Sequence, residues 1–258
     1  MYTIKLTRNI LFIIAFFIIT SINATSPSKI NNISEDIFYL IYNQQFNDAE
    51  NFLLSEKCSL NPSLYILMKT ELEWWKAITS KDDSSLKTFS KILNAHNTFK
   101  QDEQFDQLIY QSYELRLSAI QHNEFKAFLN YLSIKKCIRK LELNKHVYSD
   151  DVRKLMQLYI CLFEYGTSNS FPFLNSIKKE NVKKNQLIII ESLSKDTNLV
   201  VKTLGTYFLG KIYLEIEKNP TKAAQHFSFL TSCYPNNITF KEQLLKCKKN
   251  DIIKTLEL

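Results

Sequence analysis

Glycine is the residue that most constrains the fold of this chain, because only three glycines occur among its 258 residues. They are Gly166, Gly205 and Gly210. Tight strand hairpins need glycine where φ is positive, and phosphate-cradling loops need it where the backbone approaches the ligand. The scarcity therefore predicts a nearly all-helical fold and argues against a Rossmann, P-loop or kinase-like nucleotide site.

The composition is otherwise that of a globular protein, with 45% hydrophobic and 23% charged residues. The formal net charge is +7, but the lysines are scattered and the densest runs, "SIKKENVKK" and "KCKKND", are short. Nucleic-acid binders gather their charge on one face beside aromatic or arginine readers. We therefore expect solvated helix faces and no nucleic-acid partner.

The first 24 residues have the three parts of a secretory signal peptide. Lys5 and Arg8 precede the apolar run "NILFIIAFFIIT", and small residues follow it up to Ala24. The apolar run is shorter than the roughly 20 residues that a membrane span needs, and no cysteine follows that could carry a lipid. We predict cleavage after Ala24 and export without a mature transmembrane span; an uncleaved anchor is the alternative.

After a polar linker over 25–34, amphipathic segments follow one another with short breaks. Asn61 is a predicted cap with Pro62 at the first helical position, Ser34 and Ser149 are further caps, and Gly166 is a predicted helix end. The segment "NQLIIIESLSK" could be a buried strand, but its length and neighbours favour a helix. About eleven helices are expected, in one domain over 35–258.

One stretch, "YFLGKIYLEIEKNPTKAAQHFSFLTSCYPNN", has the pattern of a tetratricopeptide repeat, a pair of antiparallel helices with large and small apolar residues at set places. The matching repeat-packing residues are Leu209, Gly210, Tyr213, Ala223, Ala224, Phe227 and Pro235. In this resemblance Gly210 and an alanine let the two helices approach, and Pro235 ends the unit. The resemblance implies a right-handed helical-hairpin solenoid of the tetratricopeptide type.

A second and weaker match, "QFNDAENFLLSE", lies near the N-terminus, and the following helix resembles the Trp-Trp helix of exported tetratricopeptide-like proteins of Gram-negative bacteria. Trp74 and Trp75 project about 100° apart on a helix. One is expected in the core and the other at a groove or a helix seam. Core packing and contact with a partner are both open for this pair.

No catalytic, cofactor or metal site is predicted. The four histidines are dispersed, and the chain has no His-Glu-x-x-His, Cys-x-x-Cys or Gly-x-Ser-x-Gly motif. The first-helix positions that grip a peptide carboxylate in some tetratricopeptide domains hold Tyr207 and Lys211, so that binding mode is not expected. Of the five cysteines, Cys233 and Cys247 are the closest pair, the one candidate for a disulfide.

These features predict an exported tetratricopeptide-like scaffold or adaptor, without catalytic activity, that binds a protein or peptide partner. The expected location is the periplasm or the outer membrane of a Gram-negative bacterium. A helical envelope hydrolase with an unrecognised active site is the alternative. A helical sugar-binding protein of the outer surface is disfavoured by the short chain and the missing lipid-anchor cysteine.

Overall fold

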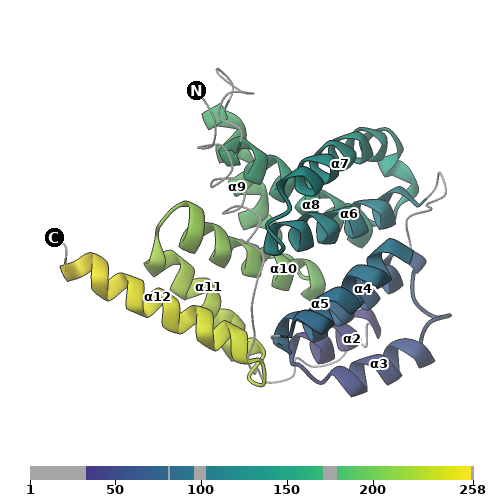
Figure 1. Cartoon of the computed structure of the whole chain (residues 1–258), viewed down its shortest axis with the longest axis horizontal. Coiled ribbons are helices and arrows are strands. Elements are labelled where there is room, and N and C mark those ends of the chain that lie inside the picture. The colour runs from purple at the N-terminus through teal and green to yellow at the C-terminus, as the bar shows by residue number, and fades with distance from the viewer. Residues whose placement is uncertain (1–32, 81, 96–102, 171–178, 257–258) are drawn as a thin grey trace. The chain divides into compact units, whose positions relative to one another are not determined.

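The computed structural model describes residues 33–80, 82–95, 103–170 and 179–256, and these are helices and short connections (Figure 1). Within these ranges there are eleven α-helices, a 3₁₀ turn and a π-helical turn, and no strand. Over the described residues, the all-helical prediction and the expected number of about eleven helices are confirmed. The predicted signal peptide and most of the linker lie outside the described residues.

The helices follow one another with short connections. Their bounds are α2 Ile33–Tyr42, α3 Phe46–Ser55, α4 Pro62–Thr79, α5 Asp83–Ala95, α6 Gln104–Ile120, α7 Glu124–Asn144, the 3₁₀ turn η2 Lys145–Val147, α8 Asp150–Ser170, α9 Lys179–Leu193, α10 Leu199–Lys211, the π-helical turn η4 Ile212–Ile216, α11 Pro220–Cys233 and α12 Ile238–Leu256. The isoleucine-rich segment is thus helical, as its length predicts. Gly166 does not end its helix, because α8 continues to Ser170.

Asparagine begins four of these helices. An Asn side-chain oxygen accepts a hydrogen bond from a backbone N–H of the first turn, which otherwise has no partner. The capping residues are Asn61 for α4, Asn123 for α7, Asn198 for α10 and Asn219 for α11. Pro62 and Pro220 follow two of them at the first helical position, where proline loses no hydrogen bond.

Three turns adopt the left-handed conformation without glycine. Gln44 has φ 57°, His122 has φ 54° and Lys218 has φ 52°. Each follows a helix and lets the chain reverse into the next one, a position where glycine is usual. The chain therefore has non-glycine residues at these turns, at the cost of some backbone strain.

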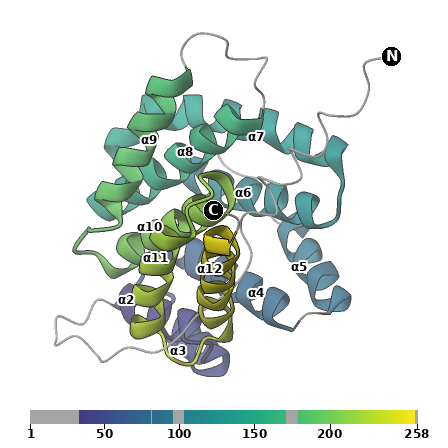
Figure 2. The same ribbon diagram turned by 90° about the vertical axis from the view of Figure 1, so that its left-hand side faces the viewer.

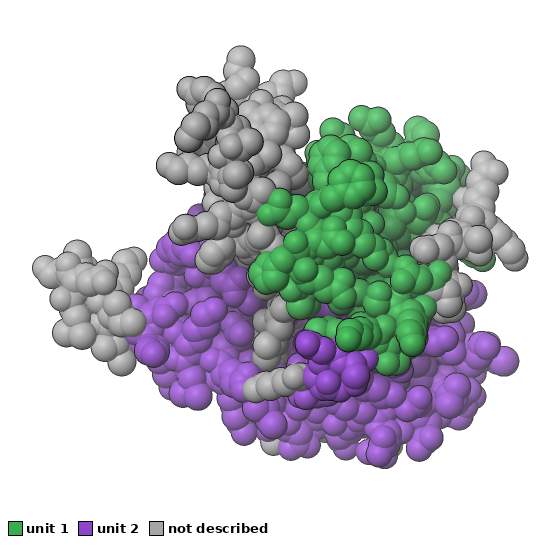
Figure 3. Space-filling model, viewed as in Figure 1, with its two compact units in different colours: residues 1–17, 86–193 green, residues 18–85, 194–258 purple. Residues whose placement is uncertain are grey.

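The described helices form two compact units, shown in separate colours in Figure 3. One domain over 35–258 was expected. Unit 1 holds most of α5 and all of α6–α9, up to Leu193, whereas unit 2 joins the helices up to Ser85 to those from Ser194 onward. Unit 2 is therefore built from two separate stretches of chain.

Unit 2 has an aromatic core to which both of its stretches contribute. The Trp75 ring lies edge-on to Tyr42, Tyr207 and Phe240, with centroids 5.1, 6.3 and 6.4 Å away. Figures 1 and 2 both show α11 and α12 side by side, and Phe227 of α11 packs against Phe240 of α12 at 6.3 Å. Burial of these rings is the main apolar stabilisation of the unit.

Polar contacts close unit 2 between its two ends. Gln44 Nε2 donates to Asn237 Oδ1 at 3.1 Å across a sequence separation of 193, and the Asn236 backbone N–H donates to Asn43 Oδ1 at 3.0 Å. In an open solenoid each repeat contacts only its neighbours in the chain. The pairing of the first and last described helices differs from that arrangement.

Unit 1 consists mainly of two hairpins, α6 with α7 and α8 with α9. Its core includes Phe89 against Tyr113 and Phe105 against Tyr159, with centroids 5.9 and 6.4 Å apart. The buried Arg116 guanidinium lies 4.3 Å from the centre of the Tyr113 ring. A cation over an aromatic face is attracted by the ring quadrupole, which helps to offset the burial of this charge.

Candidate functional site

Both tryptophans proposed as partner contacts are buried, and Trp75 lies in the aromatic core of unit 2. Trp74 is 2% exposed and Trp75 is 1% exposed. Trp75 Nε1 donates to Glu71 Oε2 at 3.0 Å, and the Tyr42 hydroxyl donates to the same oxygen at 3.2 Å. The structure therefore does not place one tryptophan at a groove, and neither indole is accessible to a partner.

The repeat-packing residues lie where α10 and the turn after it face α11. Leu209, Gly210, Tyr213, Ala223 and Phe227 are buried, whereas Ala224 and Pro235 are half-buried. A β-carbon built on Gly210 would come within 2.9 Å of Phe227 Cζ. The Tyr213 ring is stacked on His226, with centroids 5.6 Å apart and planes 5° apart. These residues bring the two helices together, as a packing role requires, and they leave no binding surface between them.

The last residue of α10 is a lysine whose burial sequence reasoning did not predict. Lys211 is 1% exposed and forms an ion pair with Glu215, and Lys246 lies 3.6 Å from the same carboxylate. Burial lowers the pKa of Lys211, while the nearby Glu215 carboxylate opposes that shift. A lysine and a carboxylate that neutralise each other are better explained as a structural contact than as a reactive amine.

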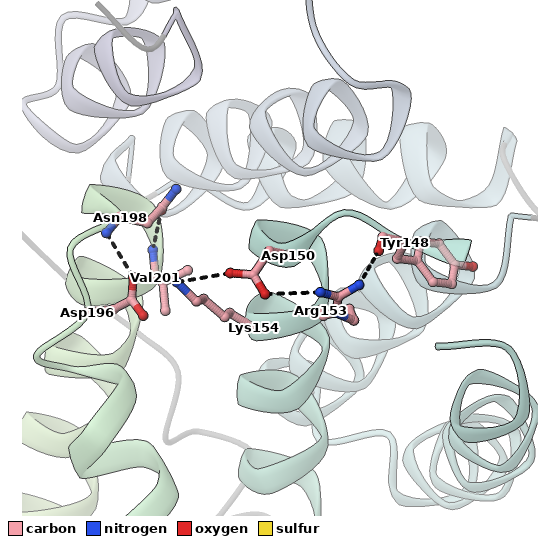
Figure 4. A network of polar contacts seen from close by, with 7 residues as sticks. All are labelled: Tyr148, Asp150, Arg153, Lys154, Asp196, Asn198 and Val201. Atoms are coloured by element: carbon pink, nitrogen blue, oxygen red, sulfur yellow. Dashed lines mark hydrogen bonds and ion pairs between the residues drawn. The ribbon is translucent and has the colours of Figure 1, made fainter. Parts of the chain in front are cut away.

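Unit 1 contains a cavity of about 570 Å³ that is lined by the C-terminal end of α7, by α8 and by α9. At the start of α8, Asp150 pairs with Arg153 at 3.1 Å and Lys154 at 3.3 Å, and Arg153 also donates to the Tyr148 carbonyl at 2.9 Å (Figure 4). The hydrogen bond from Lys154, with that from Arg153, lowers the pKa of Asp150. This network fixes the charges at one end of the cavity.

Further along the cavity lie Glu164, Gln186 and Cys161. Gln186 donates to the Glu164 carboxylate, and burial, with a smaller contribution from Glu142, raises the pKa of Glu164. Burial also raises the pKa of Cys161 to about 12, so this thiol is protonated at neutral pH and is a poor nucleophile. The cavity offers one carboxyl with a raised pKa and no activated nucleophile beside it.

Helix α7 has two apolar faces. Its inner face buries Ala127, Ile134, Cys137, Ile138 and Leu141. On the opposite side four large apolar residues stand in solvent: Phe125 (73% exposed), Phe128 (45%), Leu129 (48%) and Leu132 (46%). Their spacing of three, four and seven residues puts them on one side of the helix. We call these four residues the apolar stripe of α7.

The apolar stripe is anchored to the unit by stacked rings. Phe128 stacks on Tyr131 with centroids 6.4 Å apart, and Tyr131 stacks on Phe163 of α8 at 5.4 Å. These contacts therefore restrain the position of the Phe128 ring. The signal for this surface is in the sequence, as the positions 125, 128, 129 and 132, but apolar periodicity alone assigns such positions to the core.

In comparisons with known proteins, no protein-family model matches the chain, and no curated protein or solved structure does. Among the described residues, no three His, Cys, Asp or Glu side chains are grouped so as to hold a metal ion. None of the helices in the described ranges is long and apolar enough to span a membrane.

Proposed function

We propose that this protein is an exported helical scaffold that binds a protein partner in the envelope of a Gram-negative bacterium, and that the apolar stripe of α7 is its binding surface. The observation that carries the proposal is the exposure of Phe125, Phe128, Leu129 and Leu132 on one side of one helix. Contiguous exposed apolar side chains mark interaction sites in soluble proteins.

The energetic argument is simple. Burying an exposed Leu or Phe side chain completely contributes about 1.5–3 kcal/mol. Four partly exposed side chains of this kind together contribute several kcal/mol to an interface, which offsets part of the roughly 4–15 kcal/mol that association costs. Phe125, the most exposed of them, would contribute most.

Two further features support the proposal. The N-terminal sequence has the form of a signal peptide, which supports export to the periplasm or the outer membrane. The hairpin of α10 and α11 has the packing residues of a tetratricopeptide unit, with Gly210 against Phe227. In this proposal the chain is a tetratricopeptide-like scaffold, with a right-handed arrangement of its hairpins, and has no catalytic activity of its own.

A helical envelope hydrolase is the second candidate, and the raised pKa of Glu164 in the unit 1 cavity favours it. A carboxyl with a raised pKa is better suited to act as a general acid. If this alternative holds, purified protein hydrolyses envelope substrates and Glu164→Gln abolishes the activity. Hydrolysis lost in this way would replace the scaffold proposal.

Cross-linking in the native envelope tests the scaffold proposal. The test variant carries Phe125→Ser and Leu129→Ser, and the control carries Leu54→Ser and Leu245→Ser, two residues that are also largely exposed but lie in unit 2. We expect the wild type and the control to yield the same cross-linked protein and the test variant to lose it. A cross-link that survives both α7 substitutions would contradict the proposal, provided that both variants keep the wild-type melting temperature.

A further inference from the structure

The exposed side of α7 changes character along the helix. After the apolar stripe, four cations follow on the same side, Lys135, Lys136, Arg139 and Lys140, and all four are exposed. Lys135, Lys136 and Arg139 each stand seven residues after a member of the stripe: Phe128, Leu129 and Leu132. Seven residues are nearly two helical turns, so each cation lies about 10 Å further along the same line. We call these four residues the basic stripe.

The cations of the basic stripe differ from the neighbouring Lys126 in their ion pairing. Lys126, on the same helix, pairs with Glu114 of α6 at 3.1 Å. In the part of the chain that the structure describes, the four cations of the basic stripe take part in no salt bridge. Their charges are therefore available to a partner, unlike that of Lys126.

We infer that the partner of α7 is an amphipathic helical segment of another protein, with apolar side chains at one end of its contact face and carboxylates at the other. This inference rests on the proposed function and names the chemistry of the partner. The spacing supports a helix, since the positions 125, 128, 132, 135 and 139 alternate steps of three and four residues as in helix-on-helix seams. The carboxylates would lie over the basic stripe.

The arrangement along α7 favours a protein segment over an anionic membrane. A helix that lies in a membrane interface has its apolar and charged residues on opposite sides of its circumference. On the exposed side of α7, the apolar and basic residues instead follow one another along the helix axis. The opposite side, which includes Ile134 and Leu141, is buried. A helix lying parallel to a lipid surface meets the same layers along its whole length, so that surface does not match residues that change from apolar to basic along the axis.

A second copy of this chain is also a poorer fit than an acidic partner. Two parallel α7 helices would put one basic stripe against the other, and two fully overlapping antiparallel helices would put each basic stripe over an apolar stripe. Both pairings leave the cations without carboxylates, and like charges across an interface suppress association. Charge complementarity thus selects a different, acidic chain.

Synthetic peptides supply a direct test on the full protein. The segregated peptide is an amphipathic helix with leucines at one end of its contact face and glutamates at the other; the mixed peptide has the same composition with the two residue types alternating along that face. We expect the segregated peptide to bind more tightly in a fluorescence anisotropy titration. Its binding should weaken as salt is raised, since ion pairs exposed at an interface are screened.

The charge variant carries Lys135→Gln, Lys136→Gln, Arg139→Gln and Lys140→Gln. Its matched control removes four other exposed lysines, with Lys87→Gln, Lys91→Gln, Lys248→Gln and Lys249→Gln. Four exposed ion pairs lost together should weaken binding of the segregated peptide by about tenfold or more at low salt. The control, with the same change in net charge, should bind within about twofold of the wild type.

Three results would overturn the inference. In the first, the segregated peptide does not bind the protein. In the second, the charge variant binds that peptide as tightly as the wild type does. In the third, the four substitutions weaken binding only to vesicles of equal parts phosphatidylcholine and phosphatidylglycerol, and not to the peptide. The last would assign the surface to a membrane. Envelope cross-linking separates the two proposals: a cross-link lost with Phe125→Ser and Leu129→Ser but kept in the charge variant leaves the scaffold standing and removes the acidic partner. A cross-link kept in both removes both.

Discussion

The ring of Phe227 occupies the space into which a side chain at Gly210 would project, since a β-carbon built on Gly210 would lie 2.9 Å from Phe227 Cζ. Both residues are buried, and Phe227 also packs against Phe240, with centroids 6.3 Å apart. The ring has little room to retreat. The close approach of α10 and α11 therefore depends on the absence of a side chain at position 210.

Substitution of Gly210 tests this packing. Gly210→Leu should lower the free energy of unfolding by about 1–3 kcal/mol through overpacking. Gly210→Ala should cost less, because alanine gains about 1 kcal/mol in helix propensity. In a Phe227→Leu background the clash is relieved, so Gly210→Ala should become stabilising. Urea unfolding followed by circular dichroism measures all four variants; an unchanged midpoint for Gly210→Leu would contradict the close crossing.

The closure of unit 2 depends on Asn237, which is fully buried. Its amide donates to the Tyr42 carbonyl and accepts from Gln44 Nε2. Asn237→Ala should destabilise the protein by about 1–3 kcal/mol, because a buried carbonyl loses its donor. The exposed Asn236 contacts Asn43 through its backbone N–H, so Asn236→Ala should change stability by no more than about 0.5 kcal/mol. Equal effects in thermal unfolding would count against the closure.

The left-handed turn at His122, with φ 54°, joins α6 to α7. Glycine adopts this conformation without the steric cost of about 1–2 kcal/mol that other residues meet. His122→Gly should therefore raise the melting temperature. Its neighbour Gln121 has φ −79°, where glycine only adds entropy to the unfolded chain, so Gln121→Gly should lower it. Calorimetry of both variants compares the two signs directly.

Thiol reactivity tests the burial of the cysteines, all five of which are free, so no Cys233–Cys247 bond is present. Burial raises the pKa of Cys137 and of Cys161 to about 12 each, and only the thiolate reacts quickly. At pH 8, iodoacetamide should modify the exposed Cys58 first and spare Cys137 and Cys161 until the protein unfolds. Mass spectrometry of the peptides identifies the order. Modification of Cys161 as fast as Cys58 would contradict the packing of α8.

Glu164 predicts a pH dependence of stability. Because burial raises its pKa, the folded state holds this proton more tightly than the unfolded chain. Stability is therefore lost as the pH rises from the ordinary carboxyl value, about 4.3, through the raised value. Glu164→Gln removes this cost, so it should be more stable than the wild type at pH 7, and the difference should shrink toward pH 4.

Urea unfolding at the two pH values measures that difference. Glu142→Gln is the matched variant, because it removes the smaller cause of the pKa shift. It should give a change in the same direction but of smaller size. If the stability of Glu164→Gln relative to the wild type is instead lower at pH 7 than at pH 4, the surroundings of Glu164 favour its carboxylate form.

Much of the fold can be predicted from local signals. Glycine scarcity predicts helices, and Asn61 with Pro62 predicts the start of α4, because capping and proline geometry act over a few residues. The hairpin of α10 and α11 follows from the spacing of Gly210 and Phe227. These features involve neighbours in the sequence, so the sequence contains all of the information they need.

Long-range packing and the candidate site are different. Apolar periodicity shows that a face is buried but not which helix buries it, so the pairing of Trp75 with Tyr207 and Phe240 could not be predicted. Periodicity also did not show that both tryptophans are buried. Both are buried because α4 is covered on more than one side, so that adjacent residues can each be packed. Helix α7 shows the converse, since Phe125 and Leu132 have the pattern of a core face and lie in solvent.

The division of unit 2 into two stretches has a consequence for the order in which the protein assembles. The described residues of unit 1 come from one continuous stretch, 86–193, whose helices can pack together as soon as that stretch has been synthesised. Helices α2–α4 are made earlier but must wait, because Tyr42 and Trp75 pack against Phe240 of the last described helix. Until then their aromatic side chains are exposed to solvent and can aggregate, as in any chain in which segments far apart in the sequence share a core. The later of the two stretches of unit 2 therefore decides when the earlier stretch becomes native.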